Sequence, residues 1–335
     1  MTRSLSIPPG PCLHVVDRPG GLAGIYLELA KVRMMALVAL TTAVGFLLAS
    51  GSAGAFDWTR LVAVIAGTGL TAVAASVFNQ VMETDRDRLM PRTRNRPLPS
   101  GRISPTHAAS LGIVSGGLGL SMLAAYGGLA ACGLGALTLA IYLLVYTPLK
   151  VRSTLNTLVG SVVGAIPPLI GWVAVAGTID PAGWALAGIL FVWQIPHFLA
   201  LAWLYRRDYA QGGYRMLPVI DPDGLMTARA AVIWALALLP VTLALTLLGA
   251  TGWWYAAGAL VLGLWLVVRC LRLLRDRGDD GARSVFLCSL AYLPLLLCLM
   301  LLDGPAPVAS PPTMPIFPAA IQPASPPAVA GFPAP

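Results

Sequence analysis

The chain has 335 residues, of which 57% are hydrophobic and only 11% are charged, and its formal net charge is +8. Soluble globular domains carry about 25% charged residues, so this composition excludes a soluble globule and favours an integral membrane protein. The positive charge does not require a nucleic-acid partner, because basic loops that face anionic lipid account for the excess.

The chain begins with a polar arm, residues 1–25, which contains prolines and precedes the first apolar segment. We expect this arm to be retained, because no convincing small-residue cleavage site marks it as a signal peptide. At the other end, residues 303–335 are rich in Pro and Ala. Because proline opposes both helix and sheet, we expect this tail to be a disordered or polyproline-like extension.

Nine apolar segments lie between these ends, each close to the roughly 20 residues with which a helix crosses a bilayer core of about 30 Å. They are 34–50, 61–79, 107–126, 128–146, 155–177, 183–205, 227–249, 252–271 and 284–302. Their many glycines favour close packing of helices in lipid, and no period-two alternation suggests a β-barrel. The predicted fold class is all-α, a polytopic bundle of nine transmembrane helices within residues 26–302.

The positive charges predict the orientation of this bundle, because short loops rich in Lys and Arg stay in the cytoplasm. With nine spans, the basic residues of the arm and of four loops fall on one side, and only Arg60 falls on the other. The residues on the basic side are Arg3, Arg18, Lys31 and Arg33, six arginines from Arg86 to Arg102, Lys150, Arg152, Arg206, Arg207, Arg215, Arg229, Arg269, Arg272, Arg275, Arg277 and Arg283. We therefore expect a cytoplasmic N-terminus and a C-terminus on the opposite side.

Charge is concentrated in residues 79–101, NQVMETDRDRLMPRTRNRPLPSG, where the second span ends. On a helix, Asn79, Glu83 and Asp87 are four residues apart and share one face. Such a stripe at a membrane surface is costly unless it holds a cation, and Mg²⁺ accepts one or two carboxylates together with phosphate oxygens. The spacing predicts that Glu83 and Asp87 bind Mg²⁺, helped by Asn79, whereas Asp85 points elsewhere.

Arginines follow these acids in a segment that prolines interrupt, and we expect this loop to fold back over the end of the helix. They are Arg92, Arg94, Arg96 and Arg102. Guanidinium groups bind phosphate in a fork geometry, so metal-binding acids and arginines together predict a diphosphate site. The alternative is an ordinary cytoplasmic loop whose acids only balance its charge.

Two later segments add candidates on the same side of the membrane. Lys150 and Arg152 precede the fifth span, and Arg206 and Asp208 follow the sixth. His197 lies well inside the sixth span, where an ionisable group indicates a function. The alternatives are orientation signals for the basic pair and a structural histidine, bonded to a neighbouring carbonyl, for His197.

Three segments carry a family resemblance: NQVMETDRDRLMPRTRNRPLPSGRISP, YTPLKVRSTLNTLVGSVVGAIPPLIGW and WQIPHFLALAWLYRRDY. Together they resemble the UbiA-type intramembrane prenyltransferases and, among these, the branch of protoheme IX farnesyltransferases, or heme O synthases. The resemblance covers about residues 25–300. It implies a nine-helix bundle in the cell inner membrane with a cytoplasmic active site. It also implies farnesyl transfer from farnesyl diphosphate to a vinyl group of heme b, giving heme o for terminal oxidases.

The same resemblance assigns roles residue by residue. It implies that Asn79, Glu83, Asp87 and Asp208 are catalytic, that Arg92, Arg96, Lys150 and Arg152 bind the diphosphate, and that His197 contacts the heme. Arg206, from the segment after the sixth span, is a further candidate for binding the diphosphate. Glu83 stands where many relatives have Asp, and Asp208 is a single acid where other branches have a pair. Mg²⁺ is the implied cofactor and heme b a substrate. The implied partners are membrane lipid and heme A synthase or an assembly factor of a terminal oxidase.

Two other functions fit parts of the sequence. A prenyltransferase for an aromatic or quinone precursor shares the diphosphate chemistry but has no use for His197. A polytopic transporter also has many helices with charged ends, although transporters tend to place their ionisable groups near the bilayer midplane. In this chain nearly all such groups fall at one interface.

Overall fold

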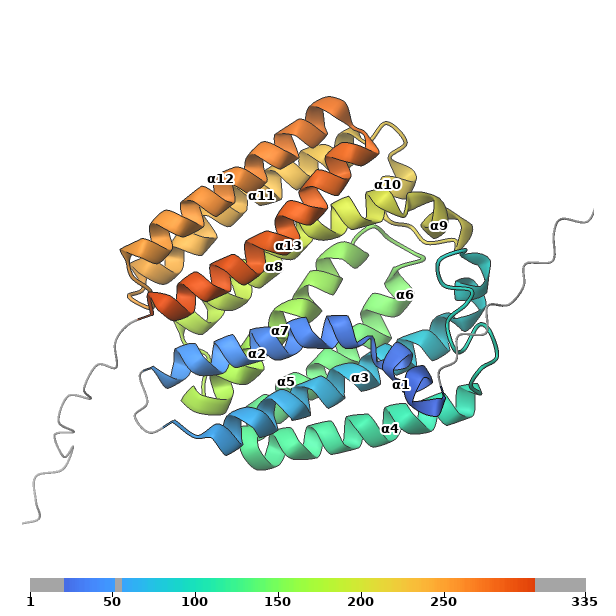
Figure 1. Cartoon of the computed structure of the whole chain (residues 1–335), viewed down its shortest axis with the longest axis horizontal. Helices are drawn as coiled ribbons and strands as arrows, with labels where there is room; N and C mark the ends of the chain where they lie inside the picture. The colour runs from blue at the N-terminus through green and yellow to red at the C-terminus, as the bar shows by residue number, and fades with distance from the viewer. Residues whose placement is uncertain (1–20, 52–55, 305–335) are drawn as a thin grey trace, which may run out of the picture.

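The computed structural model describes residues 21–51 and 56–304, and every regular element in this part of the chain is a helix (Figure 1). The predicted disordered tail lies outside the described residues, apart from its first two positions, and so does most of the predicted polar arm. The helical architecture confirms the predicted fold class.

Nine helical stretches in the described residues are long and apolar enough to cross a membrane, as the sequence predicts. They are α2 (Val32–Ser50), α3 (Trp58–Leu89), α4 (Pro105–Met122) continued by a π-helical turn (Leu123–Gly127), α5 (Leu129–Ala140) continued by a second π-helical turn (Ile141–Tyr146) and α6 (Thr147–Leu149), α7 (Asn156–Ala176), α8 (Pro181–Leu204), α11 (Leu225–Leu247), α12 (Trp253–Asp276) and α13 (Asp279–Leu302). Three short helices lie outside these spans: α1 (Leu22–Ala30), α9 (Arg206–Gln211) and α10 (Leu217–Ile220).

Helix α3 is longer than the apolar segment from which it was predicted. It begins after Asp57, whose side chain accepts a hydrogen bond from the Arg60 backbone N–H, and it ends at Leu89, before an extended Met90 that precedes a proline. Its 32 residues span roughly 48 Å at 1.5 Å per residue, which exceeds the bilayer core of about 30 Å. The last turns of α3, which carry the acidic stripe, therefore extend to the membrane surface.

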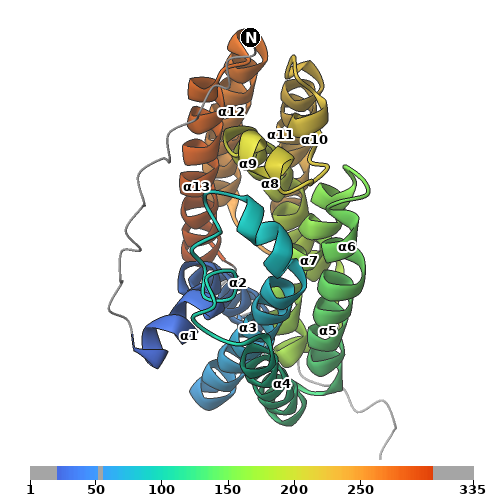
Figure 2. The same ribbon diagram turned by 90° about the vertical axis from the view of Figure 1, so that its right-hand side faces the viewer.

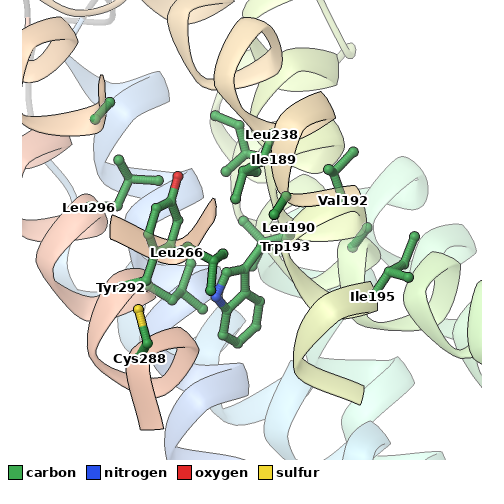
Figure 3. Close-up of a cluster of buried hydrophobic side chains, with 14 of the residues drawn as sticks. Ile189, Leu190, Val192, Trp193, Ile195, Leu238, Leu266, Cys288, Tyr292 and Leu296 are labelled. Atoms are coloured by element: carbon green, nitrogen blue, oxygen red, sulfur yellow. The ribbon is translucent and has the colours of Figure 1, made fainter. Parts of the chain in front are cut away.

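Close approach of α2 and α7 holds one side of the bundle together. A Cβ atom on Gly45 would collide with the Pro168 carbonyl of α7, and one on Gly171 would collide with the Thr42 carbonyl of α2. Only glycine allows two backbones to come this close, as in other membrane helix pairs. On the other side of the bundle, α8, α11, α12 and α13 share a large apolar core (Figure 3).

One end of the bundle gathers the polar loops. Helices α3, α6 and α8 all finish there, and α9 and the loop after α3 lie over it (Figures 1 and 2). The segments that carry the predicted site residues, although distant in sequence, therefore meet at the same end of the bundle.

Candidate active site

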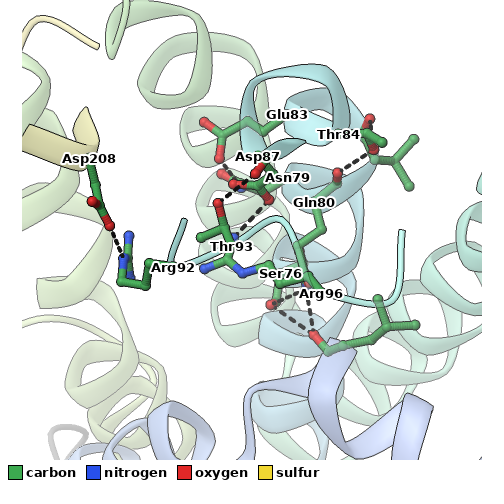
Figure 4. A network of polar contacts seen from close by, with 12 residues as sticks. Ser76, Asn79, Gln80, Glu83, Thr84, Asp87, Arg92, Thr93, Arg96 and Asp208 are labelled. Carbon is green, nitrogen blue, oxygen red and sulfur yellow. Dashed lines mark hydrogen bonds and ion pairs between the residues drawn. The ribbon is translucent and has the colours of Figure 1, made fainter. Parts of the chain in front are cut away.

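The acidic stripe of α3 is buried at this end. Asn79, Glu83 and Asp87 are 2%, 6% and 1% exposed and lie on one face of the helix (Figure 4). Asp85 points away from that face, since its side chain is 92% exposed and pairs with Arg88. The four-residue spacing thus separates three inward oxygen-bearing side chains from one outward acid.

Lys150, just after α6, compensates the first of these acids. Its Nζ lies 2.8 Å from Glu83 Oε1 and 2.9 Å from Asn79 Oδ1, and it stands 4.6 Å from the centroid of the Tyr146 ring. The Arg215 backbone N–H donates to the Lys150 carbonyl at 2.8 Å. This bond positions the Lys150 backbone from the loop that follows α9, while the oxygens of α3 contact its ammonium.

The loop after α3 folds back onto the helix, as the prolines predict. Arg96 Nη1 lies 2.8 Å from Asp87 Oδ2, and the Thr93 hydroxyl donates to the Asp87 carbonyl at 2.9 Å. Asp87 is therefore compensated by a guanidinium from its own loop, whereas Glu83 is compensated from α6.

Arg92 lies farther out and joins this loop to α9. Its Nε is 3.9 Å from Asp208 Oδ2, and its guanidinium carbon lies 4.6 Å from the centroid of the Tyr205 ring. Figure 4 shows this pair beside the stripe of α3. Asp208 thus faces an arginine of the loop.

Two predicted diphosphate residues have other surroundings. Arg152 is exposed, and Arg206 Nη1 contacts Asp279 Oδ1 at 2.7 Å and the Trp203 carbonyl at 2.8 Å. No ion pair joins either arginine to Glu83 or Asp87 in the described part of the chain. Their binding of diphosphate stays a prediction, without support from these contacts.

Lys31 is a candidate that the sequence places only among the orientation signals. It forms the junction of α1 and α2 and has a left-handed backbone, with φ of 51°, although it is not a glycine. The carbonyl of Leu29 accepts hydrogen bonds from Ser76 Oγ at 3.0 Å and Gln80 Nε2 at 2.9 Å. These bonds fix the junction against α3, one to two turns before Glu83.

The charges of the site act on Lys31. Burial, followed by the positive charges of Arg96 and Lys150, lowers the pKa of its ammonium to about 7, against the opposing effect of Glu83 and Asp87. No local signal in the sequence predicts this position, because lysine is not typical of a left-handed junction.

Tyr214 is a second residue that the sequence does not single out. It is buried in the loop after α9, which turns at Gly213 with φ of 70° and is tied to α3 by a 3.2 Å hydrogen bond from Arg86 to the Gly212 carbonyl. Burial and the nearby carboxylates of α3 raise the pKa of Tyr214 above its usual range. Its hydroxyl therefore stays protonated and can donate a hydrogen bond.

The oxygen atoms on α3 suit a hard cation. Asn79 Oδ1 and Glu83 Oε1 already converge on the ammonium of Lys150, and carboxylate and amide oxygens are ligands that Mg²⁺ accepts. Within residues 21–51 and 56–304, no three His, Cys, Asp or Glu side chains form a metal-binding group. A magnesium ion at Glu83 and Asp87 would thus draw its other ligands from Asn79, water and a bound phosphate.

His197 lies on α8, outside this charged group, and its surroundings are mostly apolar. Its ring stacks on Trp193, and its Nδ1 lies 2.8 Å from the Ser289 hydroxyl of α13. The structure thus contains two chemically different places: a charged end built on α3 and an aromatic wall between α8 and α13.

Sequence comparison places the chain among known proteins. The model of the UbiA prenyltransferase family matches residues 38–293. A protoheme IX farnesyltransferase of Solibacter usitatus is 43% identical, over 84% of this chain and 98% of the relative. The mitochondrial protoheme IX farnesyltransferase of Homo sapiens is 42% identical, over 86% of this chain and 63% of the relative.

Solved structures share the fold. One described as digeranylgeranylglyceryl phosphate synthase has a TM-score of 0.70 at 17% identity and covers 83% of this chain and 97% of its own. A UbiA homologue of Archaeoglobus fulgidus bound to GPP and Mg²⁺ has a TM-score of 0.57 at 14% identity and covers 82% of this chain and 99% of its own. At these identities the likeness concerns the arrangement of the helices.

Proposed function

The chain belongs to the UbiA prenyltransferase family, and on that premise we propose that it transfers the farnesyl group of farnesyl diphosphate to a vinyl group of heme b, giving heme o. Relatives named for protoheme IX farnesylation match most of the chain at about 40% identity. The chain carries WQIPHF in α8 and the RTRNRPL segment after α3.

One observation supports the site of this reaction above the others. Glu83 and Asp87 are both buried, and each is paired with a separate cation, Lys150 or Arg96, at 2.8 Å. Buried charges are stable only when they are compensated. A diphosphate with a divalent cation can enter such a group and exchange these pairs for new ones, with the basic side chains moving to the phosphate and the carboxylates to the cation.

In the first step, cleavage of farnesyl diphosphate, different residues of the chain have different roles. The bond between the farnesyl C1 atom and the diphosphate oxygen breaks, and its electron pair stays on the diphosphate. Lys150 and Arg96 stabilise this growing charge, and Arg92, held by Asp208, lies at the outer side. Glu83 and Asp87, with help from Asn79, would hold Mg²⁺, which would supply Lewis-acid stabilisation of the leaving group.

The second step joins the two substrates. The π electrons of the heme vinyl group form a bond to C1 of the farnesyl group, and the resulting cation takes the oxygen of a water molecule, which loses one proton. Heme b, farnesyl diphosphate and water thus give heme o, diphosphate and a proton. The apolar helices around the site exclude other water, which would otherwise quench the allylic cation. His197 is the proposed contact for the heme.

The location of the site fits the charge distribution. The chain is a multi-pass membrane protein, and the basic loops after α3, α6 and α8 lie at the same end as the site (Figure 2). Since such loops stay in the cytoplasm, we propose that residues 26–302 form a prenyltransferase domain in the cell inner membrane with a cytoplasmic active site. Contacts with heme A synthase or an assembly factor of a terminal oxidase belong to the same proposal.

The test uses the full chain in lipid vesicles with heme b, farnesyl diphosphate and Mg²⁺. We expect heme o, identified by its mass, and we expect its formation to stop when a chelator removes Mg²⁺ and to resume when Mg²⁺ is added back. The circular dichroism of the protein should not change between these conditions. A prenylated product from a phenolic acceptor, with no heme o, would contradict the proposal.

A further inference from the structure

The imidazole of His197 is held in one orientation by residues of its own helix, α8, and of the neighbouring α13. Its ring stacks on Trp193, with ring centroids 5.2 Å apart and ring planes at 22°, and on Phe286, with ring centroids 5.0 Å apart and ring planes at 29°. Its Nδ1 atom lies 2.8 Å from the Ser289 hydroxyl oxygen. The Trp193 indole N–H donates to the Ser289 carbonyl at 3.0 Å, which ties the same turn of α13 to α8 (Figure 3 shows Trp193 between the helices).

The hydrogen bonds of Ser289 determine which ring nitrogen carries the proton. The Ser289 hydroxyl donates to the Phe286 carbonyl at 2.7 Å, and a serine hydroxyl has only one hydrogen to donate. Toward His197 it is then an acceptor, so Nδ1 is the nitrogen that bears hydrogen. In the neutral ring this leaves a lone pair on Nε2.

We propose that His197 binds the iron of the heme substrate through Nε2. This inference rests on the proposed heme substrate and selects one of two contacts that a histidine could make with it. A histidine whose second ring nitrogen donates to an oxygen atom has the arrangement usual among metal ligands. An Nε2 atom with a lone pair and no hydrogen binds a metal but cannot donate a hydrogen bond to a propionate.

The surroundings of the ring favour the same contact. A propionate is an anion and needs a cation or several donors when it is buried, whereas the two groups stacked on His197 are aromatic rings. Tyr205, which lies beside Arg92, follows His197 by eight residues, which corresponds to roughly 12 Å along the helix axis. A porphyrin bound at His197 would thus have the charged end of the bundle along the same helix, about that distance from its iron.

The first test is spectroscopic and uses the full chain with ferric heme b. We expect absorption and electron paramagnetic resonance spectra of a nitrogen axial ligand, their loss in His197→Ala, and their return when imidazole is added to that variant. His107→Ala is the matched control, because His107 lies on α4 and pairs with the Tyr26 hydroxyl. An unchanged spectrum in His197→Ala would overturn the proposal.

The second test separates iron from propionate. Metal-free protoporphyrin IX has the propionates but no iron, so wild type should prefer heme b over it, and His197→Ala should lose that preference. His197→Gln can donate to a propionate but is a poor iron ligand, and we expect it to behave like His197→Ala. Recovery of heme affinity in His197→Gln, or equal binding of both porphyrins by wild type, would show that the contact is with a propionate.

Ser289→Ala tests the role of the hydrogen-bond chain. Loss of a group that orients a metal-ligating histidine lowers metal affinity on the order of 10-fold or more, and we expect that loss for heme b but not for protoporphyrin IX. The Trp193 bond remains, because it uses the Ser289 backbone. Equal losses for both porphyrins would assign Ser289 a purely structural role and contradict the tautomer argument.

Failure of this inference and failure of the proposed function give different results. If wild type makes heme o while His197→Ala keeps its spectrum, only the iron contact is wrong. If the iron contact is present but no heme o forms, the proposed reaction is wrong and the heme site stands.

Discussion

The charged end of α3 and the aromatic wall around His197 stabilise buried ionisable side chains in different ways. Both place ionisable side chains in an apolar bundle, where an uncompensated polar group is costly. At α3, each buried carboxylate has a cation within 2.8 Å. At α8, His197 has two stacked aromatic rings and one hydroxyl, a setting for a neutral group.

The difference indicates how two unlike substrates can meet in one bundle. Paired charges can exchange their partners for those of a diphosphate and a divalent cation, so the end of α3 suits a polar headgroup. A neutral imidazole between aromatic rings suits a flat, apolar ring system with a metal at its centre. The comparison predicts that substitutions at the end of α3 affect the protein by removing or adding charge. Substitutions around His197 on α8 should affect it by changing the orientation of the imidazole ring.

The largest expected effect is on stability, in Lys150→Met. This change leaves the carboxylate of Glu83 buried without its ammonium, and breaking a buried pair in this way costs about 3–5 kcal/mol. Unfolding in detergent, followed by circular dichroism, measures the loss, and adding Glu83→Gln to the same chain should recover part of it.

The control for this prediction is Arg88→Met, which breaks the exposed pair with Asp85. Exposed pairs contribute about 0–1 kcal/mol, so this variant should unfold like wild type. Equal stability of Lys150→Met and Arg88→Met would show that the end of α3 is solvated and that the contrast with α8 is mistaken.

A smaller effect, on turnover, should separate neighbouring acids of α3. Asp87→Asn keeps the shape of the side chain but removes the charge, and we expect heme o formation to fall about 100-fold or more, as when a group that stabilises developing charge is lost. Asp85 lies two residues before Asp87, and its side chain is exposed. Asp85→Asn should therefore retain wild-type turnover. Similar losses of turnover in both variants would mean that turnover depends on the total negative charge of this segment and not on the acids of the inward face of α3.

The sequence predicts much of this arrangement because its signals are local. Hydropathy predicts the nine spans, and the four-residue spacing predicts which acids of α3 share a face. The contacts of Arg206 and Lys31 depend instead on helices that meet only in the fold. Arg206 finds Asp279 at the start of α13, and Lys31 depends on hydrogen bonds between the Leu29 carbonyl and α3. No spacing along the chain encodes such contacts.

The smallest expected effect is a pH dependence that originates at Lys31. Its pKa is lowered to about 7 by burial and by Arg96 and Lys150, so in the free protein its ammonium is present below that pH and is lost as the pH rises through it. A bound diphosphate favours the charged form, so the KM for farnesyl diphosphate should rise a few-fold between about pH 6 and pH 8, as linkage requires.

Lys31→Met should remove this pH dependence and keep the KM at its high-pH value, whereas Lys31→Arg, which stays charged, should keep the low value across the range. Arg33→Met is the matched control, because Arg33 is an exposed basic residue in the first turn of α2, two residues after Lys31. If the pH dependence persists in Lys31→Met, another group of the site titrates near pH 7 and Lys31 does not face the diphosphate. If it disappears, the charged end extends from α3 to the junction before α2, and the contrast with the neutral wall at α8 becomes sharper.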